Sequence, residues 1–423
     1  MTTAPTAPAP ATPSSPPPPP PSRVGSLGAW LRANLFRNRT DAVVTVVVGS
    51  ILLYTLYRFL RFLFVTGRWE IVRVNLPLYL TGAWPSDQLW RITAVIIAAA
   101  VIGGLAAGVA ARRAAEAPDR VDTGPRPPGR VALDLLDRLW PAIATVVLLL
   151  LLARTTAPWL LVAAAVVVAV VANQVGRRLP LRVGWLVNLA IPVGVVAALW
   201  FLNGGVGWND WGGLLLNLAL AAIAITLCFP FGVLLALGRR STFPILRLLS
   251  TVYIELFRGV PLIALLLLAN QALGFFIPQS IAPGRTVRAI VVLTLFTAAY
   301  VAEIVRGGLQ SVPPGQIEAG KANGLTAVAI TRRIVLPQAI RNVIPALVGQ
   351  FISLFKDTTL AGAAMGFLDL LRAAEASTQQ DAFRGAGLIA EALVFVLLVF
   401  WAGSYTMSRE SQRLEKRLGV GIR

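Results

Sequence analysis

Two acid and arginine pairs fall inside long apolar runs of this chain. Glu255 and Arg258 are three positions apart, and Glu303 and Arg306 repeat the arrangement. Residues at that spacing share one face of a helix, so we expect each acid to pair with its own arginine. Charges inside a membrane are costly unless they are paired or face water. Each pair therefore predicts either a polar path suited to a zwitterion or an ion-pair clamp that fixes helix packing. For Arg306, a place near the membrane boundary is a third interpretation.

Two further polar features interrupt apolar segments. Lys356 and Asp357, followed by Thr358, end one apolar run and could either line the outer part of a path or cap helices. Gly259 and Pro261 interrupt another run, where a broken helix would free backbone groups to line a cavity. A simple kink is the alternative.

The sequence lacks the residues and motifs on which most other kinds of functional site depend. There is no histidine, which removes the commonest general base and metal ligand, and the single Cys228 cannot form an internal disulfide. No phosphate-binding G-x-x-x-x-G-K-[ST] motif, H-E-x-x-H motif or C-x-x-C motif is present. We therefore expect neither an enzyme nor a cofactor bound by this chain, and any energy must come from a partner.

The composition indicates an all-α polytopic membrane protein. Hydrophobic residues make up 56% of the chain, charged residues only 13%, and the formal net charge is +19. The basic residues lie in short clusters between apolar runs and not in a stripe interleaved with aromatic residues, which argues against a nucleic-acid partner. Membrane lipid is the expected surrounding.

Apolar runs long enough to cross a bilayer as helices follow one another from residue 42 onward, and we expect about ten of them. The third run, 139–153, is the shortest, and it is the least apolar at its start. In the second, the small residues Gly104 and Gly108 predict close contact with another helix. The ten runs are 42–65, 92–111, 139–153, 159–175, 183–202, 212–237, 245–277, 286–305, 340–356 and 387–407.

The distribution of basic residues predicts the orientation. If the N-terminus is cytoplasmic, the loops on that side hold many more arginines and lysines than the opposite loops, which hold chiefly Arg68, Arg73, Arg154 and Arg285. The positive-inside rule therefore places both termini in the cytoplasm.

Three regions follow from these patterns. Residues 1–40 begin with a Pro-rich tract that cannot form a core, and we expect a disordered cytoplasmic tail. Residues 41–205 form a membrane extension of about five spans, and residues 206–423 form a core of five more.

Residues 311–345 form a polar interruption between two apolar runs of that core. Pro313 and Pro314 suit the start of a helix, and Gly324 provides a joint before a second helix that should run until Pro337 interrupts it. The segment therefore predicts a helix, a bend and a helix.

Within the segment, one spacing is formed by Glu318, Ala319, Gly324, Ile334, Leu336 and Pro337. It resembles the pattern Glu-Ala-Ala, three residues, Gly, nine residues, Ile-x-Leu-Pro, which is the EAA loop of ABC importer permeases. Gly320 stands where the pattern has its second alanine, so we expect a slightly looser first helix without loss of function. The resemblance implies that these residues couple the chain to an ATPase subunit. A loop that merely connects two spans is the alternative.

Other segments resemble permeases of the polar amino acid uptake branch, among them YIELFRGVPL and FISLFKDTTL, and residues 68–92 resemble the long permease of the general L-amino acid type. The resemblance implies a permease of the bacterial inner membrane that carries L-amino acids delivered by a solute-binding protein. It also implies two ATPase subunits, which bind ATP and magnesium, and a second, homologous permease. The alternative is a secondary transporter driven by an ion gradient, with Glu255 and Glu303 as its candidate ion ligands.

Overall fold

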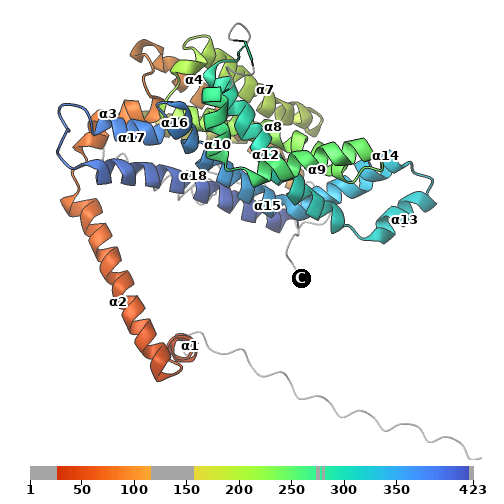
Figure 1. Cartoon of the computed structure of the whole chain (residues 1–423), viewed down its shortest axis with the longest axis horizontal. Helices are drawn as coiled ribbons and strands as arrows, with labels where there is room; N and C mark the ends of the chain where they lie inside the picture. The colour runs from red at the N-terminus through yellow and green to blue at the C-terminus, as the bar shows by residue number, and fades with distance from the viewer. Residues whose placement is uncertain (1–25, 116–156, 273–276, 279–281, 419–423) are drawn as a thin grey trace, which may run out of the picture. The chain divides into compact units, whose positions relative to one another are not determined.

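The computed structural model describes residues 26–115, 157–272, 277–278 and 282–418, which are predominantly helical and contain no β-strand (Figure 1). The predicted all-α class is thus confirmed. The chain forms two compact units, Met1–Gly67 and Arg68–Arg423. The boundary that the sequence predicts near residue 205 falls within the second unit and stays a prediction.

The first unit contains helix α1, Ser26–Asn34, and helix α2, Arg39–Arg61, which continues into a π-helical turn at Phe62–Thr66. None of the residues of α2 is buried, and together with the turn it is long and apolar enough to cross a membrane. Helix α1 lies within residues 1–40, so the prediction of disorder up to residue 40 is wrong for this part. The proline tract ends at Pro21, and α1 contains Leu, Ala and Arg, which favour helix.

Seven helices among the described residues are long and apolar enough to span a membrane, or eight if one bent pair forms a single span. The predicted run 139–153 lies outside the described residues. The predicted run 340–356 corresponds to α15, Leu336–Asp357, a helix of 22 residues that is not among these candidates. The expected total of about ten spans therefore stays a prediction.

Among the described residues, three long helices of the second unit precede the core: α4, Leu89–Ala115; α6, Ala157–Arg178; and α7, Gly184–Asn203. Helices α4 and α6 run parallel and touch backbone to backbone. A Cβ atom on Gly108 would lie 2.2 Å from the carbonyl oxygen of Asn173, and one on Gly104 would lie 2.5 Å from that of Ala169. The close helix contact predicted from these glycines is confirmed.

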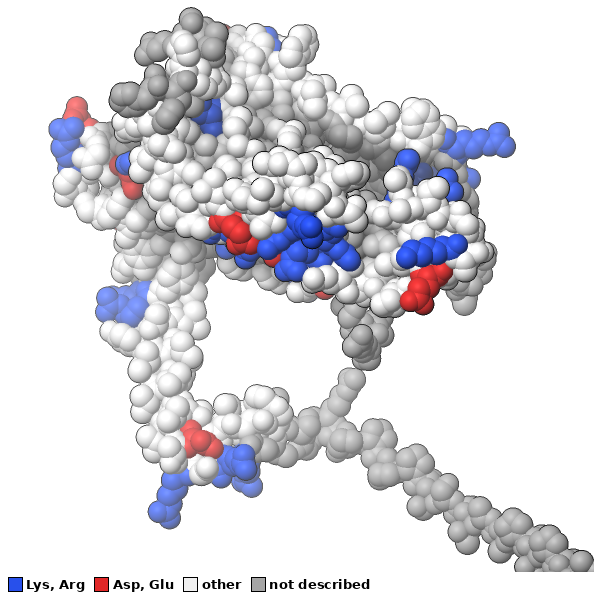
Figure 2. Space-filling model, turned by 45° about the vertical axis from the view of Figure 1, so that its right-hand side comes forward, with Lys and Arg blue, Asp and Glu red and all other residues white. Residues whose placement is uncertain are grey.

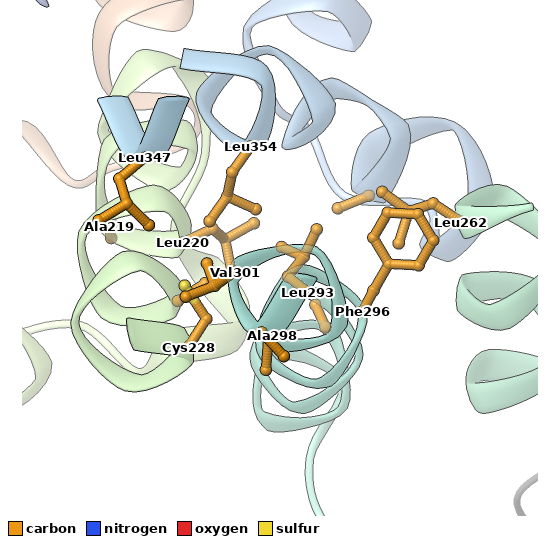
Figure 3. Close-up of a cluster of buried hydrophobic side chains, with 14 of the residues drawn as sticks. Ala219, Leu220, Cys228, Leu262, Leu293, Phe296, Ala298, Val301, Leu347 and Leu354 are labelled. Carbon is orange, nitrogen blue, oxygen red and sulfur yellow. The ribbon is translucent and has the colours of Figure 1, made fainter. Parts of the chain in front are cut away.

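The core is built around α8, Gly213–Arg239, and α12, Arg285–Gln310, with α15 packed across them. Figure 3 shows Leu220 and Cys228 of α8 facing Leu293 and Val301 of α12, with Leu354 of α15 above them. Small residues allow the close approach, since Gly232 of α8 lies directly against Val301. Cys228 is completely buried in this core.

Between α8 and α12 the chain forms α9, Pro244–Gly259, then α10, Leu262–Leu267, and a π-helical turn at Leu268–Ala272. The two helices are bent by 100° at the break, where Pro261 precedes α10. The interruption predicted at Gly259 and Pro261 is confirmed, and the angle makes it much sharper than a simple kink.

Helix α3, Glu70–Thr81, was not predicted, because it lies between the predicted runs 42–65 and 92–111. The helix has only 12 residues and contains Pro77, so it lacks the long apolar run that marks a span. It packs against α8, α17 (Leu370–Ser377) and α18 (Ile389–Leu418), and Ile71, Val72 and Tyr79 are completely buried.

After α15 the chain turns through the short helices α16, Thr359–Met365, and α17 before α18 returns along α15. In Figure 1, α16 and α17 lie at one end of the second unit, whereas α13, Pro314–Ala322, and α14, Ala327–Ile330, lie at the other. Helix α15 extends from α14 at one end to α16 at the other. The second unit therefore has two distinct ends.

Candidate functional site

The two-helix loop predicted at residues 311–345 is present. Helix α13 begins with Pro313 as its N-cap residue and Pro314 in its first turn, as predicted. Proline suits this position because the first N–H groups of a helix have no intrahelical partner. Helix α14 is capped by the Thr326 hydroxyl, which accepts a hydrogen bond from the backbone N–H of Ala329 at 3.3 Å.

Gly324 closes the first helix in a left-handed conformation, with φ of +74°. Its N–H donates to the carbonyl oxygen of Lys321 at 2.9 Å, and the N–H of Leu325 donates to that of Gly320 at 3.1 Å. This pair of bonds is the Schellman arrangement, which places a glycine just after the helix. The positive φ explains the glycine, since a side chain is strained in that conformation.

Gly320 is the buried residue of α13, where it contacts the following helical segment. A Cβ atom at this position would lie 3.0 Å from Cγ1 of Ile330 and 3.2 Å from Cδ1 of Ile334. The departure from the family pattern thus marks a tight contact between the two halves of the loop. An alanine here would require these side chains to move by a few tenths of an ångström.

The predicted end of the second helix at Pro337 is wrong. A π-helical turn, Thr331–Val335, connects α14 to α15, and Pro337 lies in the first turn of α15. The wider hydrogen-bonding pattern of a π turn accommodates a proline, which has no N–H to donate. The second half of the loop and the following helix are therefore continuous.

The loop presents one exposed face and attaches by the other. Glu318, Ala319 and Val328 are exposed, Val328 to 76%. Ile330 and Val335 are buried in the main core cluster. The base of the loop is held by Asn342 of α15, whose Nδ2 donates to Oγ of Ser311, the C-cap residue of α12, at 2.9 Å.

A charged cluster lies close to this base, at the ends of three core helices. Oε1 of Glu303 accepts from Nη1 of Arg239 at 2.6 Å, and Oε2 accepts from Nη2 of Arg306 at 2.9 Å. Nη1 of Arg258 lies 3.7 Å from Oε2. The side chain of Glu303 is only 17% exposed, so this carboxylate joins α8, α9 and α12 in a largely buried position.

The predicted pairings are partly right. Glu303 and Arg306 pair as expected, but Glu255 pairs with Arg239, whose Nη2 lies 2.9 Å from its Oε1. Glu255 and Arg258 therefore form no pair with each other, because each reaches across to a neighbouring helix. Arg239 was missed as a member, since its position after an apolar run indicated only a loop.

Thr358 belongs to a second polar group, which is fully buried. Its Oγ1 accepts from Nδ2 of Asn217 at 3.0 Å, and the same amide donates to Oδ2 of Asp369 at 3.3 Å. Asp369 caps α17 by accepting from the N–H of Arg372. Burial raises the pKa of the Asp369 carboxyl, although the hydrogen bonds that it accepts oppose this shift. Asn217, an amide within an apolar run, was the sequence signal for this group.

Lys356 is exposed and Asp357 half-buried at the end of α15, next to this group. Lys356 contributes its backbone carbonyl, which accepts from Oγ1 of Thr359 at 2.8 Å. In the part of the chain that the structure describes, no group of three His, Cys, Asp or Glu side chains could hold a metal ion. Figure 2 shows charged side chains gathered in a few patches, with a broad uncharged surface between them, as suits a membrane protein.

Comparisons with known proteins identify the family of this chain. The model of the family "binding-protein-dependent transport system inner membrane component" matches residues 228–409. The inner membrane amino-acid ABC transporter permease protein YhdY of Escherichia coli (strain K12) is 42% identical over 228 residues, which cover 52% of this chain and 61% of that relative.

A longer match is found with the glutamate/glutamine/aspartate/asparagine transport system permease protein BztC of Rhodobacter capsulatus. It is 33% identical over 353 residues, covering 83% of this chain and 78% of BztC. The crystal structure of an amino acid ABC transporter with histidines aligns at 31% identity and a TM-score of 0.43, covering 48% of this chain and 90% of that one. The chain belongs to the inner-membrane permease family of binding-protein-dependent ABC transporters, in the group whose named members are amino-acid permeases.

Proposed function

We propose that this chain is the permease subunit of an ATP-driven importer that forms a translocation path for L-amino acids. The observation that carries the proposal is the capped two-helix loop, exposed at one end of the helical core and continuous with α15. The names of YhdY and BztC support amino acids as the substrate class. For BztC these include glutamate, glutamine, aspartate and asparagine, and we propose that the substrates of this chain come from that set.

The loop is the proposed contact with an ATPase subunit. Glu318 and Ala319 lie on the exposed face of α13, Gly324 sets the angle between the helices, and Gly320 packs the halves together. Ile334, Leu336 and Pro337 connect the loop to α15. Closure of the ATPases would push on α13 and α14, and α15 would carry the displacement into the core.

The assembly that we propose contains two ATPase subunits, a second homologous permease and a solute-binding protein. ATP and magnesium would be bound and ATP hydrolysed by the ATPase subunits, so that this chain is itself not an enzyme. Both termini and the loop would face the cytoplasm. The excess of arginine and lysine in the segments predicted to lie on that side supports this orientation.

For the charged residues within the core we propose two different roles. The three arginines around Glu303 favour a clamp that holds the ends of α8, α9 and α12 together near the loop, and Glu255 extends the clamp through Arg239. Lys356 and Asp357 lie at the other end of α15, beside the buried Thr358, where we propose that they line the outer part of the path.

The first test uses Gly324→Asp in the reconstituted transporter. The substitution strains a backbone with φ of +74° by about 1 kcal/mol and adds a charge at the proposed ATPase contact. We expect normal membrane insertion but a several-fold loss of amino acid uptake per ATP hydrolysed. Uptake and phosphate release would be measured together in proteoliposomes.

Gly385→Asp is the matched control, because Gly385 has φ of +75° and open space around it, as Gly324 does, but lies in the segment between α17 and α18. It should leave the uptake per ATP close to that of the native protein. Normal coupling in Gly324→Asp would contradict the proposed contact. Uptake driven by an ion gradient without any ATPase would instead favour the secondary transporter, which the family membership already argues against.

A further inference from the structure

A cavity of about 690 Å³ opens at the end of the second unit opposite to the two-helix loop. Its lining includes Leu368, residues of α17 and Ile389 at the start of α18. Helix α15 has 22 residues. At 1.5 Å per residue it is about 33 Å long, close to the roughly 30 Å hydrocarbon core of a bilayer. Figure 1 shows α16 and α17 at one end of this helix and α14 at the other. The cavity therefore lies about one membrane thickness from the loop.

Two opposite charges of one helix line this cavity. Nη1 of Arg372 lies 3.0 Å from Oε2 of Glu375, and their side chains are 48% and 44% exposed. Exposed pairs of this kind typically stabilise a fold by only about 0 to 1 kcal/mol. The fold therefore does not depend on this pair, and a ligand with both charges can replace each partner.

The walls of the cavity are held by other contacts, which do not involve the ion pair of Arg372 and Glu375. On one side, Oδ1 of the buried Asp369 accepts from the backbone N–H of Arg372 at 3.0 Å and fixes the start of α17. On the other side, Nη1 of Arg285 donates to the carbonyl oxygen of Gly366 at 3.2 Å, and its guanidinium lies 4.4 Å from the ring centroid of Phe367. The two charged side chains thus project from a preformed frame.

We propose that this cavity is an entrance subsite for a free α-amino acid, an inference that rests on the proposed function. Arg372 would donate two hydrogen bonds to the α-carboxylate, and Glu375 would accept from the α-ammonium group. The two charged groups of an amino acid are attached to the same carbon, so they match a pair of side chains only 3.0 Å apart. Leu368 and Ile389 offer apolar surface to the ligand side chain, and Gln379 offers a polar contact.

The test is equilibrium binding of tritiated L-glutamine to the assembled transporter in nanodiscs, without the binding protein. Arg372→Gln and Glu375→Gln should each weaken binding by about tenfold or more, because each removes a charge-assisted hydrogen bond. Glutamine methyl ester, which lacks the carboxylate, and N-acetyl-glutamine, which lacks the ammonium, should not compete. Arg73→Gln is the matched control, since Arg73 forms the same kind of exposed pair with Glu70 three residues away on α3, outside the lining, and it should bind normally.

The exchange Arg372→Glu with Glu375→Arg separates a ligand role from a structural one. It keeps an ion pair on the helix but reverses the order of its charges, so binding should be lost while the thermal midpoint stays unchanged. Unaltered L-glutamine binding in this variant and in both single variants would overturn the subsite. Normal L-glutamine binding in these variants, combined with loss of the stimulation of ATP hydrolysis by the binding protein, would also overturn the subsite, in favour of a docking contact for the binding protein. ATP-driven uptake by the native transporter tests the proposed function separately, because it does not depend on these variants.

Discussion

One buried carboxylate joins three segments that are far apart in the sequence. Asp369 caps α17, accepts from Asn217 of α8, and through that amide is connected to Thr358 at the end of α15. Buried polar groups are stable only when their hydrogen bonds are satisfied, and this group satisfies several at once. It fixes the end of the core that carries the cavity.

We expect Asp369→Ala to lower the free energy of unfolding by about 2 kcal/mol, because it removes a helix cap and a partner of the buried Asn217. Asp369→Asn is the matched variant, since asparagine caps helices as well as aspartate does, and its loss should stay within about 1 kcal/mol. Denaturation in detergent, followed by tryptophan fluorescence, would compare them. Equal losses in the two variants would contradict the capping role.

The same two variants should differ in their pH dependence. Because burial raises the pKa of Asp369, the folded state holds this proton more strongly than the unfolded state does. The contribution of this group to stability is therefore present at low pH and is lost as the pH rises through the folded-state pKa. Asp369→Asn cannot titrate, so this decline should be absent from its stability curve.

Elements were predictable where one apolar run forms one helix. The long runs around α2, α4, α8 and α12 each gave a helix, and the break before Pro261 was visible as a Gly and Pro interruption. Helix α3 was missed because its burial comes from packing against α17 and α18, which no local pattern reveals.

In the candidate site, contacts within one helix were likewise predictable, whereas contacts between helices were not. Spacing along one helix correctly predicted the pair of Glu303 and Arg306. It failed for Glu255, whose partner Arg239 lies on another helix. The π turn before Pro337 was likewise unpredictable, since proline alone suggests the end of a helix and the continuous α14 and α15 depend on contacts with the core.

Contact between α4 and α6 provides a prediction at the level of elements. Gly108→Ala places a Cβ atom 2.2 Å from a backbone oxygen of α6, so the helices must separate, and we expect a loss of about 2 kcal/mol. Gly103→Ala is the matched control on the same helix, because nothing lies within 4 Å of its Cβ position. It should be neutral or stabilise by up to about 1 kcal/mol, since alanine favours helix over glycine.

Apparent unfolding midpoints of the purified protein in one detergent would rank these two variants against the native chain. A lower midpoint for Gly103→Ala than for Gly108→Ala would show that the glycine spacing does not govern this helix contact.

At the scale of the whole molecule, the second unit carries the two proposed functional features at its opposite ends. The loop of α13 and α14 and the clamp around Glu303 lie at one end, while the Asp369 group and the cavity lie at the other. Helices α15 and α18 connect them, and Phe355 of α15 packs on Phe400 of α18 with ring centroids 4.9 Å apart. Movement at the loop can therefore reach the cavity through a packed pair of helices. We expect the two ends to face opposite sides of the membrane.

That arrangement predicts opposite accessibility of two introduced cysteines. Val328→Cys lies on the exposed face of the loop, where the native side chain is 76% exposed, and Asp381→Cys lies beyond α17, where the native side chain is 98% exposed. In right-side-out membrane vesicles, an impermeant maleimide should label Asp381→Cys and spare Val328→Cys, and inside-out vesicles should give the reverse. The native chain is the control, because its single Cys228 is completely buried and should not react in either preparation. Labelling of Val328→Cys in right-side-out vesicles would place the loop away from ATP, so the distribution of basic residues would have misassigned the orientation and the loop could not contact an ATPase.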